Sequence, residues 1–288
     1  MLLAILGLPG AASAASVIHV PQNQPTIQGA INAASDGDQV IVGSGYWDEN
    51  INFKGKAIEV RAFQPGAATI VGGQRGPVVT FASGEGPGSV LRGFVISGGR
   101  SDSEGGGVRI VGASPTIVDN TMSDNSAVGG GGGIAVLNGS PVISGNRVFA
   151  NAQTGGSGLP AGGGLLVRGA STAQITRNRI GSNRSNGPGG GIGLYQAGSP
   201  TIRDNVLSYN GSASQGAGMA VSGSPSAALI VQNEFMTNAT TSAGGGISWD
   251  VPAGERGPWL VSNSFGGNIA AFASALHGSG PQADVLVV

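Results

Sequence analysis

Asparagine recurs in this chain at a nearly constant interval, within a fixed frame of apolar residues. Each of these asparagines stands three residues after an aliphatic residue and two residues before another apolar residue. The six copies, about 28 residues apart, are Asn120, Asn146, Asn178, Asn205, Asn233 and Asn263. A second asparagine follows each of them by five residues, at Asn125, Asn151, Asn183, Asn210, Asn238 and Asn268. A period of this length is typical of solenoids, propellers and other repeat arrays.

A glycine cluster that ends in an apolar residue completes each repeat. The 55 glycines among 288 residues would also fit a flexible low-complexity chain, but 40% hydrophobic residues is too many for a disordered polymer. The clusters begin at Gly105, Gly131, Gly162, Gly189, Gly216 and Gly244. We therefore expect glycine to mark fixed corners, where it adopts the positive φ angles that β-branched residues avoid.

The repeat predicts an all-β solenoid, because each unit has short apolar stretches and no helical period. Stacking the units about 4.8 Å apart makes each one the neighbouring strand of the next and buries the aliphatic columns. The asparagines at matched corners are then expected to form structural ladders, their amides bonding to the coils above and below. Regular coils should cover residues 90–270. No proline- or serine-rich linker divides the chain, so residues 15–288 are interpreted as one domain.

The N-terminal part predicts a cap for this stack. Residues 26–34 fit a short amphipathic helix with Thr26 as its N-cap and with Ile27 and Ile31 on one face. A helix laid across the first coil would cover its apolar end. A turn at residues 36–38 and strands at 39–42, 51–53, 57–62, 69–71, 78–81 and 90–96 are expected to follow.

The first 14 residues are interpreted as a secretory signal peptide. An apolar run from Leu2 to Leu8 is followed by small residues, with cleavage expected after Ala14, although no Lys or Arg precedes the run. A buried first strand is the alternative for this run. No later stretch is long enough to span a bilayer, so we expect a secreted or cell-surface protein.

The chain resembles the pectin-lyase-like superfamily of right-handed, single-stranded parallel β-helices. The resemblance covers about residues 17–270 and is carried by the N-terminal pattern Val20-Pro21, Pro25-Thr26-Ile27-Gln28, Asp36-Gly37-Asp38 and Gly45-Tyr46, and by the asparagine-ended, glycine-rich coils. It implies the fold, but not one activity, because this superfamily contains lyases, hydrolases, epimerases, phage tailspikes and non-catalytic surface proteins. The aspartate clusters and histidine-glycine signature of its galacturonan hydrolases are absent from this sequence, and its acids are scattered.

A run of arginines without acidic residues marks the middle coils. No Asp or Glu stands between Asp124 and Asp204, whereas six arginines do: Arg147, Arg168, Arg177, Arg179, Arg184 and Arg203. The period places Arg147 and Arg179 in one column, and Arg177 and Arg203 on one outward face. Like charges at the spacing of stacked strands repel one another unless they are solvated or bound to anions.

These arginines suggest a site for an acidic polysaccharide, because the planar guanidinium matches carboxylates and sulfates. The predicted binding residues are Arg147, Arg168, Arg177, Arg179, Tyr195 and Arg203, with Tyr195 next to Arg168 in its column and able to stack on a sugar. A five-residue insertion within residues 153–161 is expected to protrude near this site. The alternative is an ordinary soluble exterior that happens to use arginine.

We expect a largely non-catalytic protein, with a polysaccharide lyase or glycoside hydrolase as the alternative. For the latter, Asp250 and Glu255, beside an insertion at 251–258, form the best acid/base pair. His277 is expected to be an edge residue, and residues 47–49 a turn. The formal charge of −1 does not favour a nucleic-acid partner, the absence of cysteine and of histidine clusters predicts no metal site, and no cofactor is expected.

Overall fold

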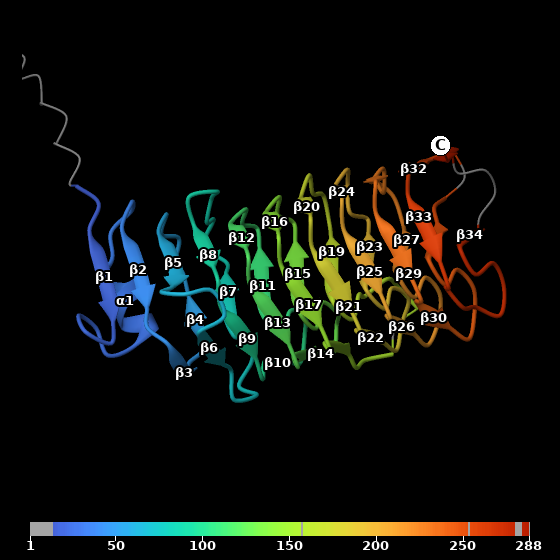
Figure 1. The fold of residues 1–288 in the computed structure, drawn as a ribbon. Coiled ribbons are helices and arrows are strands. Elements are labelled where there is room, and N and C mark those ends of the chain that lie inside the picture. The colour runs from blue at the N-terminus through green and yellow to red at the C-terminus, as the bar shows by residue number, and fades with distance from the viewer. Residues whose placement is uncertain (1–13, 157, 253, 280–283, 288) are drawn as a thin grey trace, which may run out of the picture.

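The chain winds into a right-handed parallel β-helix. The structure, a computed structural model, describes residues 14–156, 158–252, 254–279 and 284–287. Figure 1 shows the coils stacked along one axis, with helix α1 at the N-terminal end. The expected fold class is thereby confirmed. The signal peptide expected at residues 1–14, and its alternative as a first strand, lie almost wholly outside the described residues.

Within the described residues, the strands form four sheets of 11, 9, 9 and 6 strands, here called A, B, C and D. Sheet A contains β1 (Val17–Val20), β2 (Gln39–Val42), β5 (Glu59–Ala62), β8 (Val90–Arg92), β12 (Thr116–Val118), β16 (Val142–Ser144), β20 (Gln174–Thr176), β24 (Thr201–Arg203), β28 (Leu229–Val231), β32 (Arg256–Val261) and β35 (Asp284–Val287). Sheet B contains β3 (Gly45–Asp48), β6 (Ala68–Val71), β9 (Val95–Ser97), β13 (Thr121–Ser123), β17 (Arg147–Phe149), β21 (Arg179–Gly181), β25 (Val206–Ser208), β29 (Glu234–Met236) and β33 (Ser264–Gly266).

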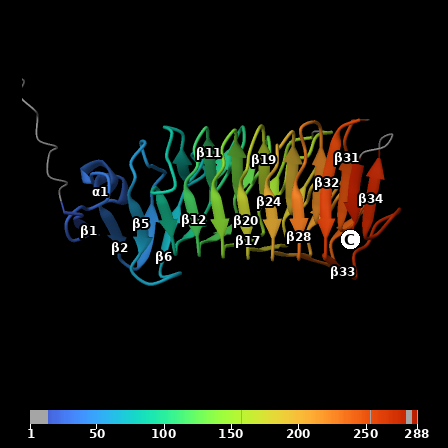
Figure 2. The same cartoon turned by 90° about the horizontal axis from the view of Figure 1, so that it is seen from above.

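The other two sheets complete each coil. Sheet C contains β4 (Ile51–Asn52), β7 (Val79–Phe81), β11 (Val108–Val111), β15 (Ile134–Leu137), β19 (Leu165–Arg168), β23 (Ile192–Tyr195), β27 (Met219–Ser222), β31 (Ile247–Asp250) and β34 (Leu276–Ser279). Sheet D contains β10 (Arg100–Ser101), β14 (Ser126–Ala127), β18 (Ala152–Gln153), β22 (Arg184–Ser185), β26 (Gly211–Ser212) and β30 (Ala239–Thr240). A regular coil passes through sheets A, B, D and C in that order, and Figure 2 shows the same stack from above.

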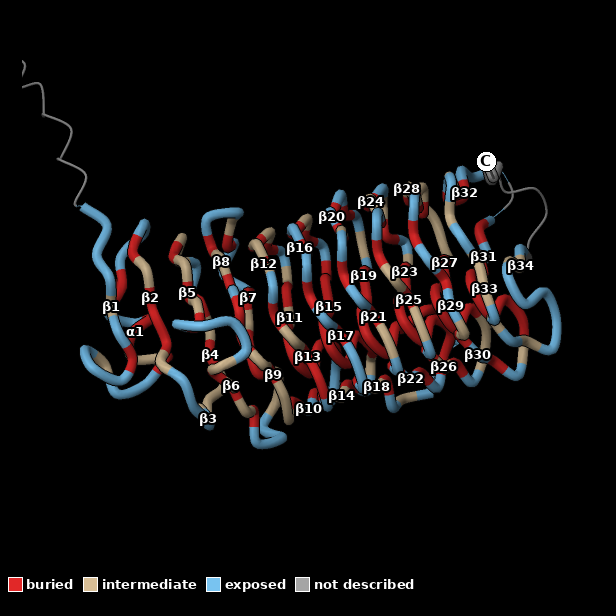
Figure 3. The backbone as a smooth tube through the Cα atoms, viewed as in Figure 1, coloured by how far each residue is buried: buried red, intermediate tan, exposed pale blue. Residues whose placement is uncertain are grey.

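The aliphatic residues of the repeat align in columns that fill the interior. In sheet A, Ile143 pairs with Ile117 on one side and with Ile175 on the other. These isoleucines are fully buried, and Figure 3 shows buried positions recurring from coil to coil along the stack. The register expected from the period is therefore confirmed, and the core is continuous from coil to coil.

The asparagines form two ladders, one at the corner between sheets A and B and one at the corner between sheets B and D. The side-chain amide of Asn178 donates to the carbonyl of Ile143 (2.9 Å) and to Oδ1 of Asn205 (3.0 Å). Its own Oδ1 accepts hydrogen bonds from the backbone N–H (2.9 Å) and the amide (3.0 Å) of Asn146. The structural role predicted for these asparagines is confirmed.

The expectation that glycine supplies the positive φ angles of the corners is confirmed for some corners only. The residue directly before a ladder asparagine has a positive φ and is mostly not glycine, as with Arg177 (φ 55°) and Tyr209 (φ 58°). In the cluster Gly162–Gly164, Gly162 has a φ of 61°, but Gly163 is required for another reason. A Cβ on Gly163 would lie 2.2 Å from the carbonyl oxygen of Arg184, because the coils touch through their backbones there.

Helix α1 (Ile27–Ala33) caps the first coils and lies within the range predicted for it. The hydroxyl of Thr26 accepts a hydrogen bond from Gly29 N–H, as expected of an N-cap. The carboxylate of Glu49 accepts hydrogen bonds from the backbone N–H groups of Ile27 and Gln28, at 2.8 and 2.9 Å. At the other end of the helix, the Lys56 ammonium donates to three backbone carbonyls, so both helix ends are tied to the stack.

Two local predictions were wrong. The single strand expected at residues 90–96 is two strands, β8 and β9, because Gly93 (φ 79°) turns the chain from sheet A to sheet B. The turn expected at residues 47–49 begins inside β3, where Trp47 pairs with Ile70. In the described part of the chain, no helix is long and apolar enough to cross a membrane.

Candidate functional site

Arg147 and Arg179 lie opposite each other in the neighbouring strands β17 and β21 of sheet B, as the period predicted. Both side chains are exposed. They line a hollow of about 300 Å³ together with Phe149, Gly181 and residues of the next strand, β25. Two guanidinium groups and an aromatic ring thus share one depression in the outer surface of the middle coils.

The hollow exists because one side chain is missing from a column. Phe149 pairs with Gly181, and Gly181 pairs with Ser208, so the large Phe149 ring stands next to an empty position. The Phe149 side chain is 37% exposed, which leaves part of the ring open to solvent. An exposed aromatic ring beside paired arginines offers both an apolar surface and a site for planar anions.

Arg177 and Arg203 are both exposed, but they do not share a column. Arg203 pairs with Thr176 in sheet A, whereas Arg177 lies one position further along, at the corner before Asn178. The Arg203 guanidinium bonds to the carboxylate of Asp204 at 3.2 Å and to Gln232 at 3.0 Å. Its charge is therefore already matched within the protein.

Arg168 and Tyr195 are neighbours in register, as predicted, but they lie on sheet C and not beside Arg147 and Arg179. The Arg168 guanidinium forms an ion pair with Glu104, whose side chain is only 11% exposed. Glu104 precedes β11, and β15 separates β11 from β19 in the sheet. The six predicted binding residues are therefore divided among different faces of the solenoid.

Four arginines of the middle coils keep an unmatched positive charge. Among the described residues, no carboxylate lies within 4.0 Å of the guanidinium nitrogens of Arg147, Arg177, Arg179 or Arg184. Arg177 and Arg179 flank the corner at Asn178, and Arg184 follows the next corner of the same coil. Of these, Arg147 and Arg179 lie in direct register, and like charges at that spacing without a carboxylate partner favour the approach of anions.

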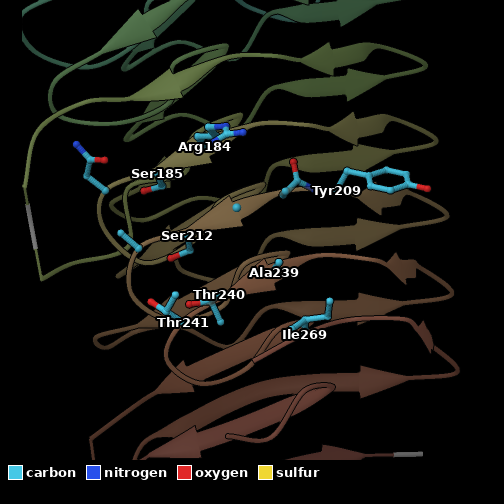
Figure 4. Close-up of a pocket in the computed structure, with 12 residues that line it drawn as sticks. Arg184, Ser185, Tyr209, Ser212, Ala239, Thr240, Thr241 and Ile269 are labelled. Carbon is cyan, nitrogen blue, oxygen red and sulfur yellow. The ribbon is translucent and has the colours of Figure 1, made fainter. Parts of the chain in front are cut away.

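A second hollow, of about 570 Å³, lies over sheet D on the other side of the second asparagine ladder (Figure 4). Arg184 and Tyr209 line it, together with the later residues Ala239, Thr241 and Ile269. Neither Tyr209 nor Phe149 was among the predicted binding residues. The sequence signal that identifies them is their position next to the ladder, since Tyr209 directly precedes Asn210 and Phe149 stands two residues before Asn151.

The predicted acid pair lies late in the chain. Asp250 ends β31 and Glu255 lies in the following loop, and both are exposed. A pocket lined by Asp250 has a volume of about 80 Å³, which is below the roughly 300–1,000 Å³ of typical small-molecule sites. The assignment of Asp250 and Glu255 as a catalytic pair stays a prediction.

The remaining candidates have structural partners or edge positions. Trp47 donates to the carbonyl of Gly43, and Asp48 forms an ion pair with Arg75. His277 lies in the edge strand β34 opposite Ser248, as expected of an edge residue. In the part of the chain that the structure describes, no group of three His, Cys, Asp or Glu side chains is arranged to hold a metal ion.

Comparison with known families identifies the class of the protein. The model of the right-handed β-helix region matches residues 83–248, which is more than half of the chain. The chain therefore belongs to the right-handed β-helix family, in agreement with the resemblance to the pectin-lyase-like superfamily. No curated protein and no solved structure was found to match it.

Proposed function

We propose that this protein binds an acidic polysaccharide on the outer face of sheet B without cleaving it. One observation carries the proposal: Arg147 lies opposite Arg179, with no carboxylate partner for either among the described residues, beside the exposed ring of Phe149. A uronate or sulfated sugar matches this surface. Its anionic group would accept hydrogen bonds from the guanidinium groups, and its apolar ring face would pack on Phe149.

The geometry of the stack suits a polymer better than a small metabolite. The hollow is open to solvent, and coils about 4.8 Å apart repeat the same backbone pitch along the surface. A linear polyanion can therefore extend over neighbouring coils and collect several weak contacts. An enclosed cleft, which would isolate a reacting bond from water, is not needed for such binding.

The proposal includes a location outside the cell or at its surface, where such polymers occur. The apolar run Leu2–Leu8 followed by small residues supports export. Expression of the whole chain with its first 14 residues should yield an exported protein that begins near Ala15. Intact mass and N-terminal sequencing check this, and an unprocessed protein retained in the cytoplasm would contradict it.

The binding test compares two double variants that remove the same charge. Arg147→Ala with Arg179→Ala deletes the unmatched pair, whereas Arg92→Ala with Arg203→Ala deletes two exposed arginines that are already ion-paired with Glu59 and Asp204. Affinities for polygalacturonate, alginate, hyaluronan and chondroitin sulfate are measured against neutral dextran at rising salt. We expect at least a tenfold loss in the first variant, less than a twofold loss in the second, and weaker binding at higher salt.

Two results would overturn the proposal. Affinity that is insensitive to salt, or equal in both double variants, would show that the unmatched arginines do not bind the polymer. Release of unsaturated sugars or new reducing ends would replace the non-catalytic assignment with a lyase or hydrolase. In that case Asp250→Asn and Glu255→Gln would test the predicted acid pair.

A further inference from the structure

We infer that the hollow over sheet D is a second subsite, which binds a further acidic sugar of the same polysaccharide chain. This inference rests on the proposed function of the first hollow. It extends the binding site from the outer face of sheet B, around the second asparagine ladder, to sheet D. The minimum ligand is therefore an oligosaccharide long enough to reach both hollows.

The sheet D hollow has the size and lining of a sugar site. Its volume of about 570 Å³ lies within the range of small-molecule pockets. Arg184, Gly211 and Ala239 occupy one outward column, so two small residues follow a long cationic one. Figure 4 shows Arg184 at the top of the hollow, Ala239 further down, Tyr209 at one side and Ile269 near the bottom.

The lining selects for a sugar that carries an acid. Among the described residues, Arg184 has no carboxylate partner, and a uronate carboxylate could accept two hydrogen bonds from its planar guanidinium. Tyr209 is 67% exposed and, with Ile269, gives the apolar surface that a pyranose ring can cover. Asn186 and Thr241 add polar groups that match sugar hydroxyls.

The two hollows are close enough to share one ligand because they meet at the same corner. Ser182 lines the first hollow, and Arg184, two residues later, lines the second. One coil further, Ser208 lines the first and Tyr209, its direct neighbour, lines the second. The positive φ of Ser182 and of Tyr209 turns the backbone from sheet B to sheet D between them. A flexible sugar chain can follow this turn.

The experiment measures affinity as a function of ligand length. Oligogalacturonates of two to eight sugars are titrated into the wild type, Arg184→Ala and Tyr209→Asn, the last because Asn tolerates the positive φ of this corner. Matched controls are Arg100→Ala, at the first position of the same sheet column, and Tyr46→Asn, an exposed tyrosine on β3. We expect the longest ligand to bind the wild type at least tenfold more tightly than the disaccharide, and the two test variants to lose this gain.

The outcomes separate the two proposals. If Arg184→Ala and Tyr209→Asn keep the full gain with length, the sheet D subsite is wrong, while the first hollow stands. If Arg147→Ala with Arg179→Ala binds all lengths as the wild type does, the proposed function itself is wrong. Loss of the length-dependent gain in the two test variants, with both controls unchanged, supports the second subsite.

Discussion

The carboxylate of Glu104 pairs with the guanidinium of Arg168 across two turns of the solenoid. The second carboxylate oxygen of Glu104 accepts a hydrogen bond from the hydroxyl of Ser103 at 2.9 Å, so the acid is held in place from both sides. This pair links a glycine corner of one coil to a strand of a later coil. It also removes Arg168 from the set of arginines that are free to bind an external anion.

Arg168→Ala should therefore affect stability more than binding. We expect less than a twofold loss of affinity for acidic polysaccharide, because the charge of Arg168 is already neutralised by Glu104. The free energy of unfolding should fall by about 1–2 kcal/mol, because a mostly buried carboxylate loses its cation. Isothermal titration and urea unfolding check the two effects. A tenfold loss of affinity would place Arg168 in the binding site.

Gly181→Val should close the hollow on sheet B without disturbing the fold. Gly181 has an ordinary negative φ, and the nearest atom to an added Cβ is the carbonyl oxygen of Ser208 at 3.1 Å, a tight contact that a small shift relieves. Valine also favours strands. We expect at least a tenfold loss of polysaccharide affinity with a nearly unchanged thermal midpoint. Unchanged affinity would show that the space beside Phe149 is not the binding site.

Asn178→Ala should be strongly destabilising, because it removes four side-chain hydrogen bonds in the middle of a buried ladder. The backbone N–H and the side-chain amide of Asn146, and the carbonyl of Ile143, would lose their hydrogen-bond partner in a buried position that water does not reach. We expect a loss of about 3 kcal/mol in the free energy of unfolding, measured by urea denaturation. The control Asn186→Ala removes one exposed bond to Thr154 and should cost less than about 1 kcal/mol. Equal losses would contradict the ladder.

Gly163→Ala should destabilise the stack by about 3 kcal/mol or more, because the new methyl group would overlap the backbone of the next coil. The effect does not come from φ, which is not positive at Gly163. The control is Gly86→Ala, where no atom lies within 4 Å of the added Cβ. Thermal unfolding of both variants checks the prediction, and a stable Gly163→Ala protein would mean that the coils are not in backbone contact there.

The N-terminal coil should weaken in acid. Hydrogen bonds from the backbone N–H of Ser35, and then of Ser16, lower the pKa of Asp38, with a smaller contribution from the charge of Lys56. A carboxyl whose pKa is lowered by folding adds stability above its unfolded pKa of about 3.9, and this stability is lost as the pH falls through the folded pKa. The difference in unfolding free energy between wild type and Asp38→Asn should thus be largest near neutral pH. It should shrink toward zero as the pH falls below about 4.

Urea unfolding at several pH values measures this difference, and hydrogen exchange of the β1 amides localises it. Asp102→Asn serves as a control at an exposed aspartate. A difference that is independent of pH would contradict the role given to Asp38.

The repeat made most of the fold predictable, because a fixed period determines which residues lie above one another. Aligning Asn146 with Asn178 places Arg147 opposite Arg179 and Ile143 opposite Ile175, and the structure has both pairs. The same alignment also places Phe149 opposite Gly181, so the hollow on sheet B could have been predicted from the period as well.

Contacts made by the corners were not predictable in this way. The pairing of Glu104 with Arg168 depends on how a glycine corner folds against sheet C, which the period of the strands does not determine. The division of the arginines among several faces depends on where each corner turns the chain. The expected shared face of Arg177 and Arg203 was wrong by one position, because aligning Asn178 with Asn205 places Arg203 opposite Thr176 at the end of a strand, whereas Arg177 lies in the corner just beyond that strand.

The asparagine ladders make the coils interchangeable units. Each interior asparagine offers its neighbours the same two acceptor contacts and the same two donor contacts, whatever residues face the solvent. A coil can therefore be duplicated or removed as a whole during evolution without changing how the adjoining coils join. Outward columns such as that of Arg147 and Arg179 are then free to diverge, so new ligand specificities can arise on an unchanged scaffold.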